Sequence, residues 1–431
     1  MKQTDQSFSK RYKAYVLLVL TGVYTFNFID RQILVILQES IKGELGLSDT
    51  QLGLLTGLSF ALFYVTLGIP IARFADRSNR KNIVSASLAI WSLMTAVSGF
   101  AQNFIQLLFA RIGVGIGEAG GSPPAHSMIS DYFPPEQRAT ALSIYSMGIY
   151  FGILLGYIGG GWLDQNFGWR VALMMLGLPG IVYALILLFT VKEPPRGLSD
   201  NTVGEEVPDE SFWDVLGVLL SKKTFVFLAL ACGIHTIGNY GVGNFFAPFL
   251  ARVHGMPVGQ IGLWMGLSAG FGGMAGTFLG GFLGDKLSKN DIRWYLWLPV
   301  VAEGLNFISH YGAVFSSNIN VVIFSYFVSA FLTAIYLGPC LAVTHNLVDA
   351  HKRAVASAIL FLVLNLIGLG GGPLLIGAAS DYLSADFGVE SLRYAFCLTF
   401  ITGAVAMIFF YLAAKHYKYD LGVKEEKEIF V

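Results

Sequence analysis

The sequence has few charged residues, and this scarcity excludes a soluble protein of several domains. Asp, Glu, Lys and Arg make up 13% of the 431 residues, whereas soluble domains carry roughly 25%. Apolar types account for 54% of the chain, and the mean hydropathy is +0.61. A soluble chain of this length would form about three domains, and this one lacks the polar residues to cover their surfaces. We therefore expect a protein that crosses the membrane several times.

The chain also lacks a basic excess and any cysteine pattern. Its 28 basic and 28 acidic residues leave a formal net charge of zero, so nucleic-acid binding, which depends on neutralising phosphates, is not expected. The three cysteines, Cys232, Cys340 and Cys397, have no C-x-x-C spacing. This excludes a disulfide framework and a zinc site, and we expect neither a metal nor a cofactor.

Long apolar runs are abundant, and they define the fold class. A membrane-spanning helix needs about 20 apolar residues, because the hydrocarbon layer is about 30 Å thick. The chain offers twelve such runs, which predict an all-α membrane protein with twelve transmembrane helices. Their approximate bounds are 14–38, 52–73, 82–101, 104–130, 138–163, 170–191, 223–251, 258–285, 294–314, 319–344, 354–380 and 391–414.

A polar segment divides these runs into two sets of six. Residues 193–222 are rich in Pro, Asp and Glu, and we predict a cytoplasmic linker between an N-terminal six-helix bundle, 1–192, and a C-terminal bundle with a short tail, 223–431. The end of the linker, from Ser211, is expected to form a short interfacial helix.

The distribution of Lys and Arg predicts the orientation. Only Lys42, Arg170, Arg252 and Arg393 fall in the connections that follow odd-numbered runs. Arg31 and Arg111 fall inside runs, and all other basic residues lie on the opposite side. Since positive charge accumulates on the cytoplasmic side, we expect a multi-pass protein of the inner (plasma) membrane with both termini in the cytoplasm.

A motif after the second run is partly repeated in the second half. The first copy reads Ala72-Arg-Phe-Ala-Asp76-Arg77-Ser-Asn-Arg80-Lys81, and the second reads Gly281-Phe-Leu-Gly-Asp285-Lys286. Two repeats of six spans are typical of transporters whose halves move around a central site. The first copy resembles the signature of the major facilitator superfamily. This resemblance implies a conformational gate at Asp76, Arg77 and Arg80.

Two further motifs narrow the resemblance. Asn27-Phe-Ile-Asp30-Arg31 and Arg111-x-x-x-Gly115-x-Gly117-Glu118-Ala119 look like those of bacterial members of the spinster family. That resemblance implies transport of lysophospholipids or sphingosine phosphates with proton coupling. The same motifs are similar to those of anion:cation symporters that carry sugar acids, so this alternative stays open.

Charged residues inside the membrane are costly and therefore indicate function. Asp30, Arg31, Arg111 and Glu118 are the candidates, and their formal charges cancel. We expect them to line an aqueous cavity, with Asp30, Glu118 and Arg111 coupling the proton. Arg31, Arg111 and Asn27 would bind substrate, because a guanidinium released by protonation of a carboxylate can bind an anionic headgroup through two hydrogen bonds.

The second half offers polar groups of a different kind. Asn239 and Tyr240, in the run 223–251, are predicted to bind substrate from the opposite wall. His235 is a weaker candidate for a proton site, and Glu303 is an intramembrane acid with no predicted partner. No arginine lies within a run of this half, and such an asymmetric site suits an amphipathic anion better than a sugar acid.

Two enzyme-like motifs do not alter this prediction. Gly115-Ile-Gly117-Glu-Ala-Gly120 matches a dinucleotide-binding pattern, and Gly266-Leu-Ser268-Ala-Gly270 matches a nucleophile elbow. Both patterns require a preceding strand, and both lie in predicted spans. We expect a secondary transporter, not an enzyme. Its partners would be a lipid-like or organic-anion substrate, protons and membrane lipids, and it would act as a monomer.

Overall fold

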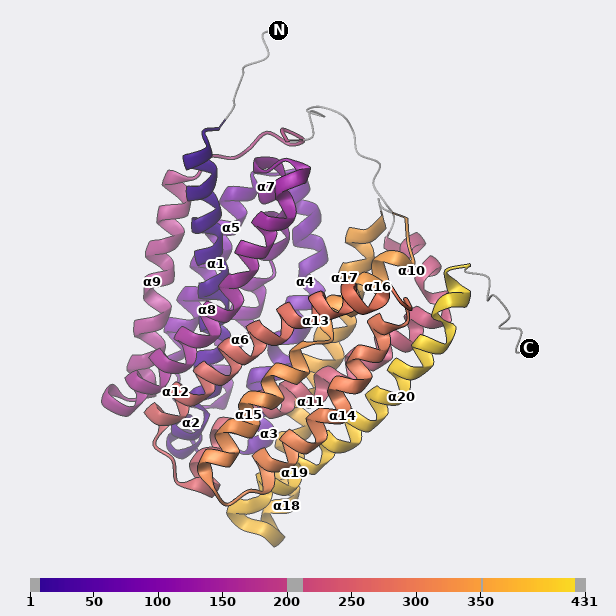
Figure 1. Ribbon diagram of the computed structural model, residues 1–431. Helices are drawn as coiled ribbons and strands as arrows, with labels where there is room; N and C mark the ends of the chain where they lie inside the picture. Colours follow the sequence, from indigo (N-terminus) through magenta and orange to yellow (C-terminus); the bar gives the residue numbers. More distant parts are fainter. Residues whose placement is uncertain (1–7, 200–211, 350–351, 423–431) are drawn as a thin grey trace, which may run out of the picture. The chain divides into compact units, whose positions relative to one another are not determined.

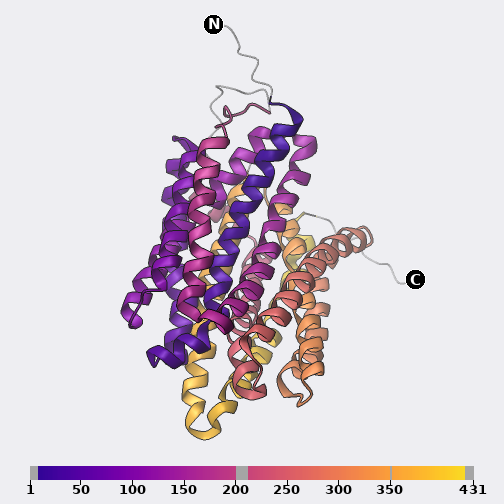
Figure 2. The same ribbon diagram turned by 90° about the vertical axis from the view of Figure 1, so that its left-hand side faces the viewer.

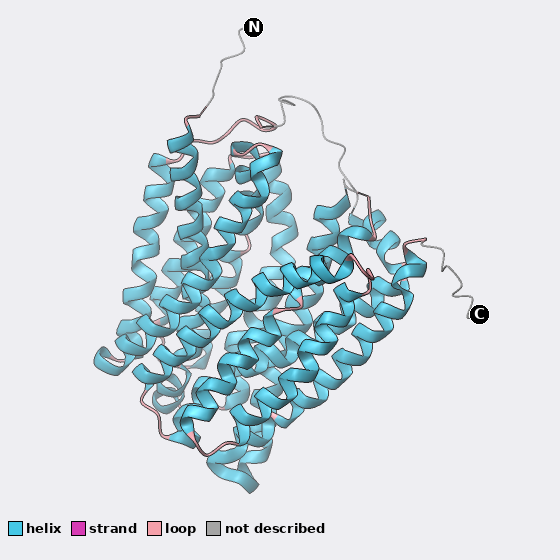
Figure 3. Ribbon diagram, viewed as in Figure 1, coloured by secondary structure: helices cyan, strands magenta, loops and turns pink. Residues whose placement is uncertain are grey.

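The computed structural model describes residues 8–199, 212–349 and 352–422, and these residues form helices joined by short loops, with no strand among them (Figure 3). The all-α prediction is confirmed. Seven helical segments of this part are long and apolar enough to cross a membrane: Lys10–Ile36, Asp49–Gly68, Pro135–Phe167, Trp169–Thr190, Lys223–His254, Ile319–Asn346 and Arg353–Asp420. The remaining predicted runs, 82–101, 104–130, 258–285 and 294–314, are helical as well.

The helices pack into two compact units, labelled by element in Figure 1. Unit 1 comprises Met1–Gly46, Leu62–Val207 and Pro257–Gly266, and unit 2 comprises Leu47–Ala61, Pro208–Met256 and Leu267–Val431. Most of each predicted half therefore lies in one unit. Two short segments pack with the other unit, at the start of the second and eighth predicted spans.

Unit 1 is built largely from the first six predicted spans. Helix α4 begins in unit 2 and continues into unit 1. Helix α12, which also belongs to unit 1, comes from later in the chain. Its elements are α1 (Lys10–Ile36), α2 (Gln38–Leu45), most of α4 (Ser59–Asp76), α5 (Arg80–Ser98), α6 (Phe104–Glu118), α7 (Ser122–Tyr132), α8 (Pro135–Phe167), α9 (Trp169–Thr190) and α12 (Val258–Leu267).

Unit 2 contains most of the later spans and the start of the second span, and its described residues include three π-helical turns, η1, η2 and η4. Its elements are α3 (Asp49–Gly53), η1 (Leu54–Leu58), α10 (Phe212–Leu220), α11 (Lys223–His254), η2 (Ser268–Gly272), α13 (Gly273–Ser288), α14 (Trp294–Phe315), α15 (Ile319–Ala334), α16 (Leu337–Asn346), α17 (Arg353–Val363), η4 (Leu364–Leu369), α18 (Gly370–Phe387), η5 (Gly388–Glu390), α19 (Ser391–Ala395) and α20 (Cys397–Asp420).

A glycine stripe on α8 fixes the position of α1. Figures 1 and 2 both show α1 running beside α8 and α9 in unit 1. A Cβ atom at Gly148 would lie 2.6 Å from the carbonyl oxygen of Thr21, and one at Gly152 would lie 2.5 Å from that of Thr25. Small residues let transmembrane helices approach this closely. The stripe therefore presses the polar segment of α1 into the centre of unit 1.

Glycines also explain why two segments pack with the other unit. A Cβ atom at Gly53 would lie 2.4 Å from the carbonyl oxygen of Pro373, so α3 packs against α18 within unit 2. In unit 1, a Cβ atom at Gly161 of α8 would lie 2.7 Å from the carbonyl oxygen of Val258 in α12. Each contact is too close for any larger residue.

The helix expected at the end of the linker is present as α10. It begins at Phe212 and buries Val215 and Leu219 while Trp213 stays exposed. An apolar helix with one buried side and an exposed Trp is typical of a membrane interface.

Candidate functional site

The intramembrane charged residues of unit 1 meet between α1 and α6. Asn27, Asp30 and Arg31 share one face of α1 because they are three and four residues apart. Arg111 and Glu118 lie two turns apart on α6. A Cβ atom at Gly117 would lie 2.7 Å from the backbone nitrogen of Trp91, so α6 packs directly on α5 at this level. Contacts between Arg31 and Glu118 and between Arg111 and Asp30 bring the four charged residues singled out from the sequence into one region of unit 1.

Arg31 and Glu118 form the ion pair of this cluster. Arg31 Nε donates to Glu118 Oε2 at 2.7 Å. The Glu118 side chain is fully buried, whereas that of Arg31 is 16% exposed. The Arg31 guanidinium also lies 5.1 Å from the ring centre of Phe28 and 5.0 Å from that of Tyr64. The cation therefore sits between a carboxylate and two aromatic rings.

Asp30 occupies a deeper position. It is 0% exposed, and neither carboxylate oxygen has a hydrogen-bond partner among the described residues. Arg111 Nη1 donates to the backbone oxygen of Asp30 at 3.4 Å rather than to its carboxylate. Trp91 and Thr95 of α5 are neighbouring polar groups. No sequence pattern singles out these two residues, because a Trp and a Thr one turn apart are common in an apolar helix.

The cluster is more enclosed than an open cavity. Asp30, Arg111 and Glu118 are buried, together with Asn27, so in this arrangement three of the four charged side chains do not face an aqueous space, contrary to the expectation from the sequence. Only the Arg31 side chain keeps appreciable exposure. An incoming ligand would therefore meet Arg31 first.

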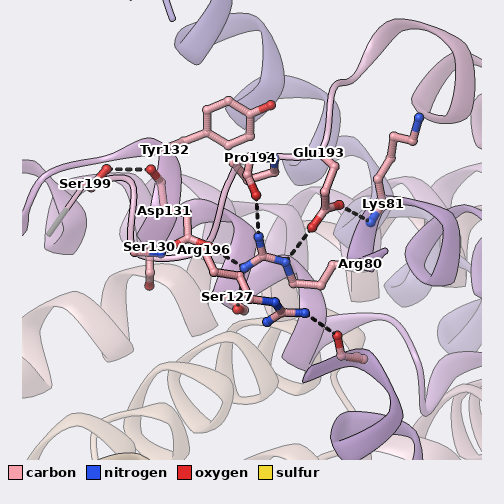
Figure 4. A network of polar contacts seen from close by, with 12 residues as sticks. Arg80, Lys81, Ser127, Ser130, Asp131, Tyr132, Glu193, Pro194, Arg196 and Ser199 are labelled. Atoms are coloured by element: carbon pink, nitrogen blue, oxygen red, sulfur yellow. Dashed lines mark hydrogen bonds and ion pairs between the residues drawn. The ribbon is translucent and has the colours of Figure 1, made fainter. Parts of the chain in front are cut away.

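Arg80, predicted as part of a gate, lies in a buried polar network at the start of α5 (Figure 4). Its guanidinium pairs with Asp131 of α7 and donates to Glu193 at 2.7 Å and to the carbonyl oxygen of Pro194 at 2.8 Å. The backbone N–H of Lys81 donates to the second Glu193 oxygen at 2.8 Å. The arginine thus ties the chain leaving α9 to α5 and α7.

The other predicted gate and substrate residues lie at the end of α4 and on α11. The Asp76 side chain lies outside the described part of α4, and Arg77 is exposed. On α11 of unit 2, Asn239 is exposed and Tyr240 is half-buried. Gate and substrate roles for these residues stay predictions.

The sequence predicted no partner for Glu303, but the structure shows one. Its carboxylate contacts His235 Nδ1, and both side chains are buried in unit 2. Sequence reasoning singled out both residues separately. It could not pair them, because they lie on α11 and α14, 68 residues apart.

The part of the chain that the structure describes contains no metal site of three or more ligands. No three His, Cys, Asp or Glu side chains gather there in a metal-binding arrangement. Cys232 and Cys340 are buried free thiols in the apolar core of unit 2.

Comparison with known proteins identifies the family. The family model of the Major Facilitator Superfamily matches residues 20–308. An MFS-type efflux pump of Mycolicibacterium smegmatis is 32% identical over 94% of this chain and 93% of its own length. A probable galactarate/D-glucarate transporter of Bacillus subtilis is 28% identical over 67% of this chain and 68% of its own. Protein spinster homolog 1 of Xenopus tropicalis is 26% identical over 98% and 84%.

A solved structure agrees with these relatives. The crystal structure of a bacterial homologue of the human lysosomal transporter Spinster, in an inward-facing and unoccupied conformation, superposes with a TM-score of 0.88. It shares 35% sequence identity and covers 96% of this chain and 99% of its own. Together with the all-helical fold, these similarities show that the chain belongs to the major facilitator superfamily of membrane transporters and resembles its bacterial spinster-type members.

Proposed function

We propose that this transporter moves a lysolipid or a similar amphipathic anion by alternating access, coupled to protons. The observation that carries the proposal is the ion pair between Arg31 and Glu118, in which a buried carboxylate holds the most accessible cation of the site. Both the proton and the substrate anion act on this pair.

The coupling follows from competition for Arg31. When Glu118 is ionised, it holds the guanidinium at 2.7 Å. When Glu118 takes up a proton, the charge that holds Arg31 disappears, and the guanidinium can bind a phosphate or carboxylate headgroup through two hydrogen bonds. An anion that draws Arg31 away removes the cation that pairs directly with the buried Glu118 carboxylate, and uptake of a proton by Glu118 compensates for that loss. Anion binding and proton binding therefore promote each other.

Asp30 and Arg111 form the inner part of the proton site. Neither carboxylate oxygen of Asp30 has a hydrogen-bond partner among the described residues, and an ionised carboxylate is costly in such a site, so uptake of a proton by Asp30 would remove this cost. Arg111 is buried beside it and contributes positive charge to both carboxylates. Asp30 can then exchange a proton when the enclosure opens.

The surroundings of Arg31 favour an amphipathic anion. Its guanidinium packs against Phe28 and Tyr64, so a bound headgroup would lie next to aromatic surface that suits an acyl or alkyl chain. A sugar acid would need several hydrogen-bond partners for its hydroxyl groups. Since a relative is named as a galactarate/D-glucarate transporter, proton-coupled transport of sugar acids is the second candidate.

The remaining assignments rest on the sequence. Basic residues are concentrated on the side that holds both termini, which favours a protein of the inner membrane with cytoplasmic ends. Asn239 and Tyr240 are the substrate contacts of α11, and the protein functions as a monomer surrounded by membrane lipids.

Reconstitution into proteoliposomes tests the substrate class. With an imposed pH step, we expect labelled lysophospholipid to cross at least about tenfold faster than in protein-free vesicles, and labelled glucarate to cross no faster than in such vesicles. An Arg31→Gln variant, which keeps a polar side chain without the charge, should remove the lysophospholipid flux. Glucarate transport without lysophospholipid transport would replace the first candidate by the second.

A further inference from the structure

We propose that Glu303 and His235 form a second proton-binding site, in unit 2, and that this site loads and unloads a proton during transport. The proposal rests on the proposed function, because it adds a second coupled proton to the same cycle. It concerns residues of α11 and α14, and none of the residues assigned to substrate or proton in unit 1.

The hydrogen bonds of His235 fix how the pair holds its proton. His235 Nε2 lies 3.1 Å from the carbonyl oxygen of Thr333. A carbonyl oxygen only accepts, so Nε2 carries a hydrogen and Nδ1 faces the Glu303 carboxylate. The contact between Nδ1 and Oε1 then requires one further proton, on either atom. Without it, a lone pair would face a carboxylate, and the two side chains would repel each other.

The neighbourhood supplies little else to stabilise a charge on Glu303. The second carboxylate oxygen accepts one long hydrogen bond, 3.5 Å, from Asn306. From α20, Gly403 faces it, and a Cβ atom there would lie 3.6 Å away. The other titratable groups near the pair are Tyr336, whose ring is tilted against that of His235 with the ring centres 4.3 Å apart, and His310, two turns further along α14. No lysine or arginine of the described residues pairs with Glu303, so the proton shared with His235 balances its charge.

His310 differs from His235 in a way that provides a control. Its Nε2 contacts Thr399 Oγ1 at 2.7 Å, and that hydroxyl donates to the carbonyl oxygen of Phe396 at 2.6 Å. The hydroxyl must therefore accept from His310. His310 makes no direct hydrogen bond to a carboxylate in the described structure.

A row of polar side chains connects the pair to one end of unit 2. Asn306 Oδ1 accepts from Ser329 at 2.7 Å and from Ser309 at 3.2 Å. One turn further, Gly312 packs against Ser325, whose Oγ would lie 2.5 Å from a Cβ at that position. Because α14 and α15 run antiparallel, this row leads from Glu303 toward the loop between Phe315 and Ile319. The positive-inside pattern places that loop outside the cell, so protons would reach the pair from there.

A proton titration of the purified protein in detergent tests the site without any substrate. Because a coupled pair titrates as a unit, we expect Glu303→Gln to bind about one proton fewer per molecule than the wild type between acidic and alkaline pH. His310→Gln is the matched control and should keep the step. An unchanged proton count in Glu303→Gln would overturn the proposal, whatever substrate the protein carries.

A measurement on the wild-type protein tests the site even if the variant misfolds. In protein with isotopically labelled histidine, NMR should show His235 with a hydrogen on Nε2 throughout and a change at Nδ1 on titration. A hydrogen fixed on Nδ1 instead of Nε2 would contradict the proposed geometry.

Accumulation of substrate tests the coupling. At a gradient of one pH unit and zero membrane potential, each coupled proton supports an about tenfold concentration ratio. Glu303→Gln should therefore lower the limiting ratio about tenfold, while exchange at equal pH persists. A normal ratio in this variant would show that the pair is structural and would overturn its role. If no lysophospholipid moves in the wild type either, the proposed function fails while the titration still decides the proton site.

Discussion

Replacing Glu118 with Gln should lower the limiting accumulation of substrate against its gradient about tenfold while leaving exchange at equal pH. The amide keeps the size of the side chain but cannot take up a proton or hold Arg31 by charge. In the wild type, a gradient of one pH unit supports an about tenfold concentration ratio for the proton that Glu118 carries. In Glu118→Gln that contribution is lost. Uptake of labelled lysophospholipid into proteoliposomes with the potential clamped measures the ratio.

The Glu118→Gln variant should also differ from the wild type in the pH dependence of its affinity for the anion. Since Arg31 is no longer held, affinity should equal or exceed that of the wild type at low pH and should no longer weaken as the pH rises. Glu44→Gln is the matched control, because Glu44 pairs with Arg170 at 2.8 Å at an exposed position of unit 1. It should accumulate substrate normally. Full accumulation by Glu118→Gln would remove Glu118 from the coupling mechanism.

Replacing Arg80 with Leu should destabilise unit 1 by about 3–5 kcal/mol, the usual effect of removing one partner from a buried ion pair. Arg80 is 1% exposed, and its removal leaves the carboxylates of Asp131 and Glu193 without their cation. Gly197 N–H still donates to Asp131 at 2.9 Å, which is too little to replace a guanidinium. Denaturant unfolding of the purified protein, followed by tryptophan fluorescence, measures the loss.

Lys81→Ala provides the comparison for Arg80. The Lys81 side chain donates one hydrogen bond, 3.1 Å, to the carbonyl oxygen of Leu188, whereas its backbone N–H holds Glu193 and survives the substitution. We expect a loss of about 1 kcal/mol. If Arg80→Leu unfolds at the same denaturant concentration as Lys81→Ala, the network contributes no more than a surface contact.

Much of the fold is readable from the sequence because the bilayer imposes length and polarity on every helix. Each predicted apolar run corresponds to a helical segment. The interruptions inside runs were not predicted. Examples are the break between α6 and α7 after Glu118 and the π-helical turn η1, whose Gly57 would place a Cβ 2.8 Å from the carbonyl oxygen of Leu369. The turn η1 thus depends on a packing partner from a distant part of the sequence.

The same distinction applies to the site. Asp30, Arg31, Arg111 and Glu118 were identifiable because charge inside an apolar run is costly wherever the helix packs. The burial of these side chains could not be predicted, because it depends on how tightly the α8 glycine stripe holds α1. Likewise, no local pattern reveals that His235 and Glu303 meet.

The account depends on a proton and an anion acting through one arginine, and proton exchange on ligand binding measures this directly. Purified protein in weakly buffered detergent, at a pH where Glu118 is ionised, receives a lysophospholipid below its micelle concentration while a pH indicator records proton exchange. The account predicts uptake of about one proton per ligand bound, because Glu118 must protonate when Arg31 leaves it. Glu118→Gln should bind the ligand with no uptake. Ligand binding by the wild type without any change in bound protons would contradict the coupling mechanism.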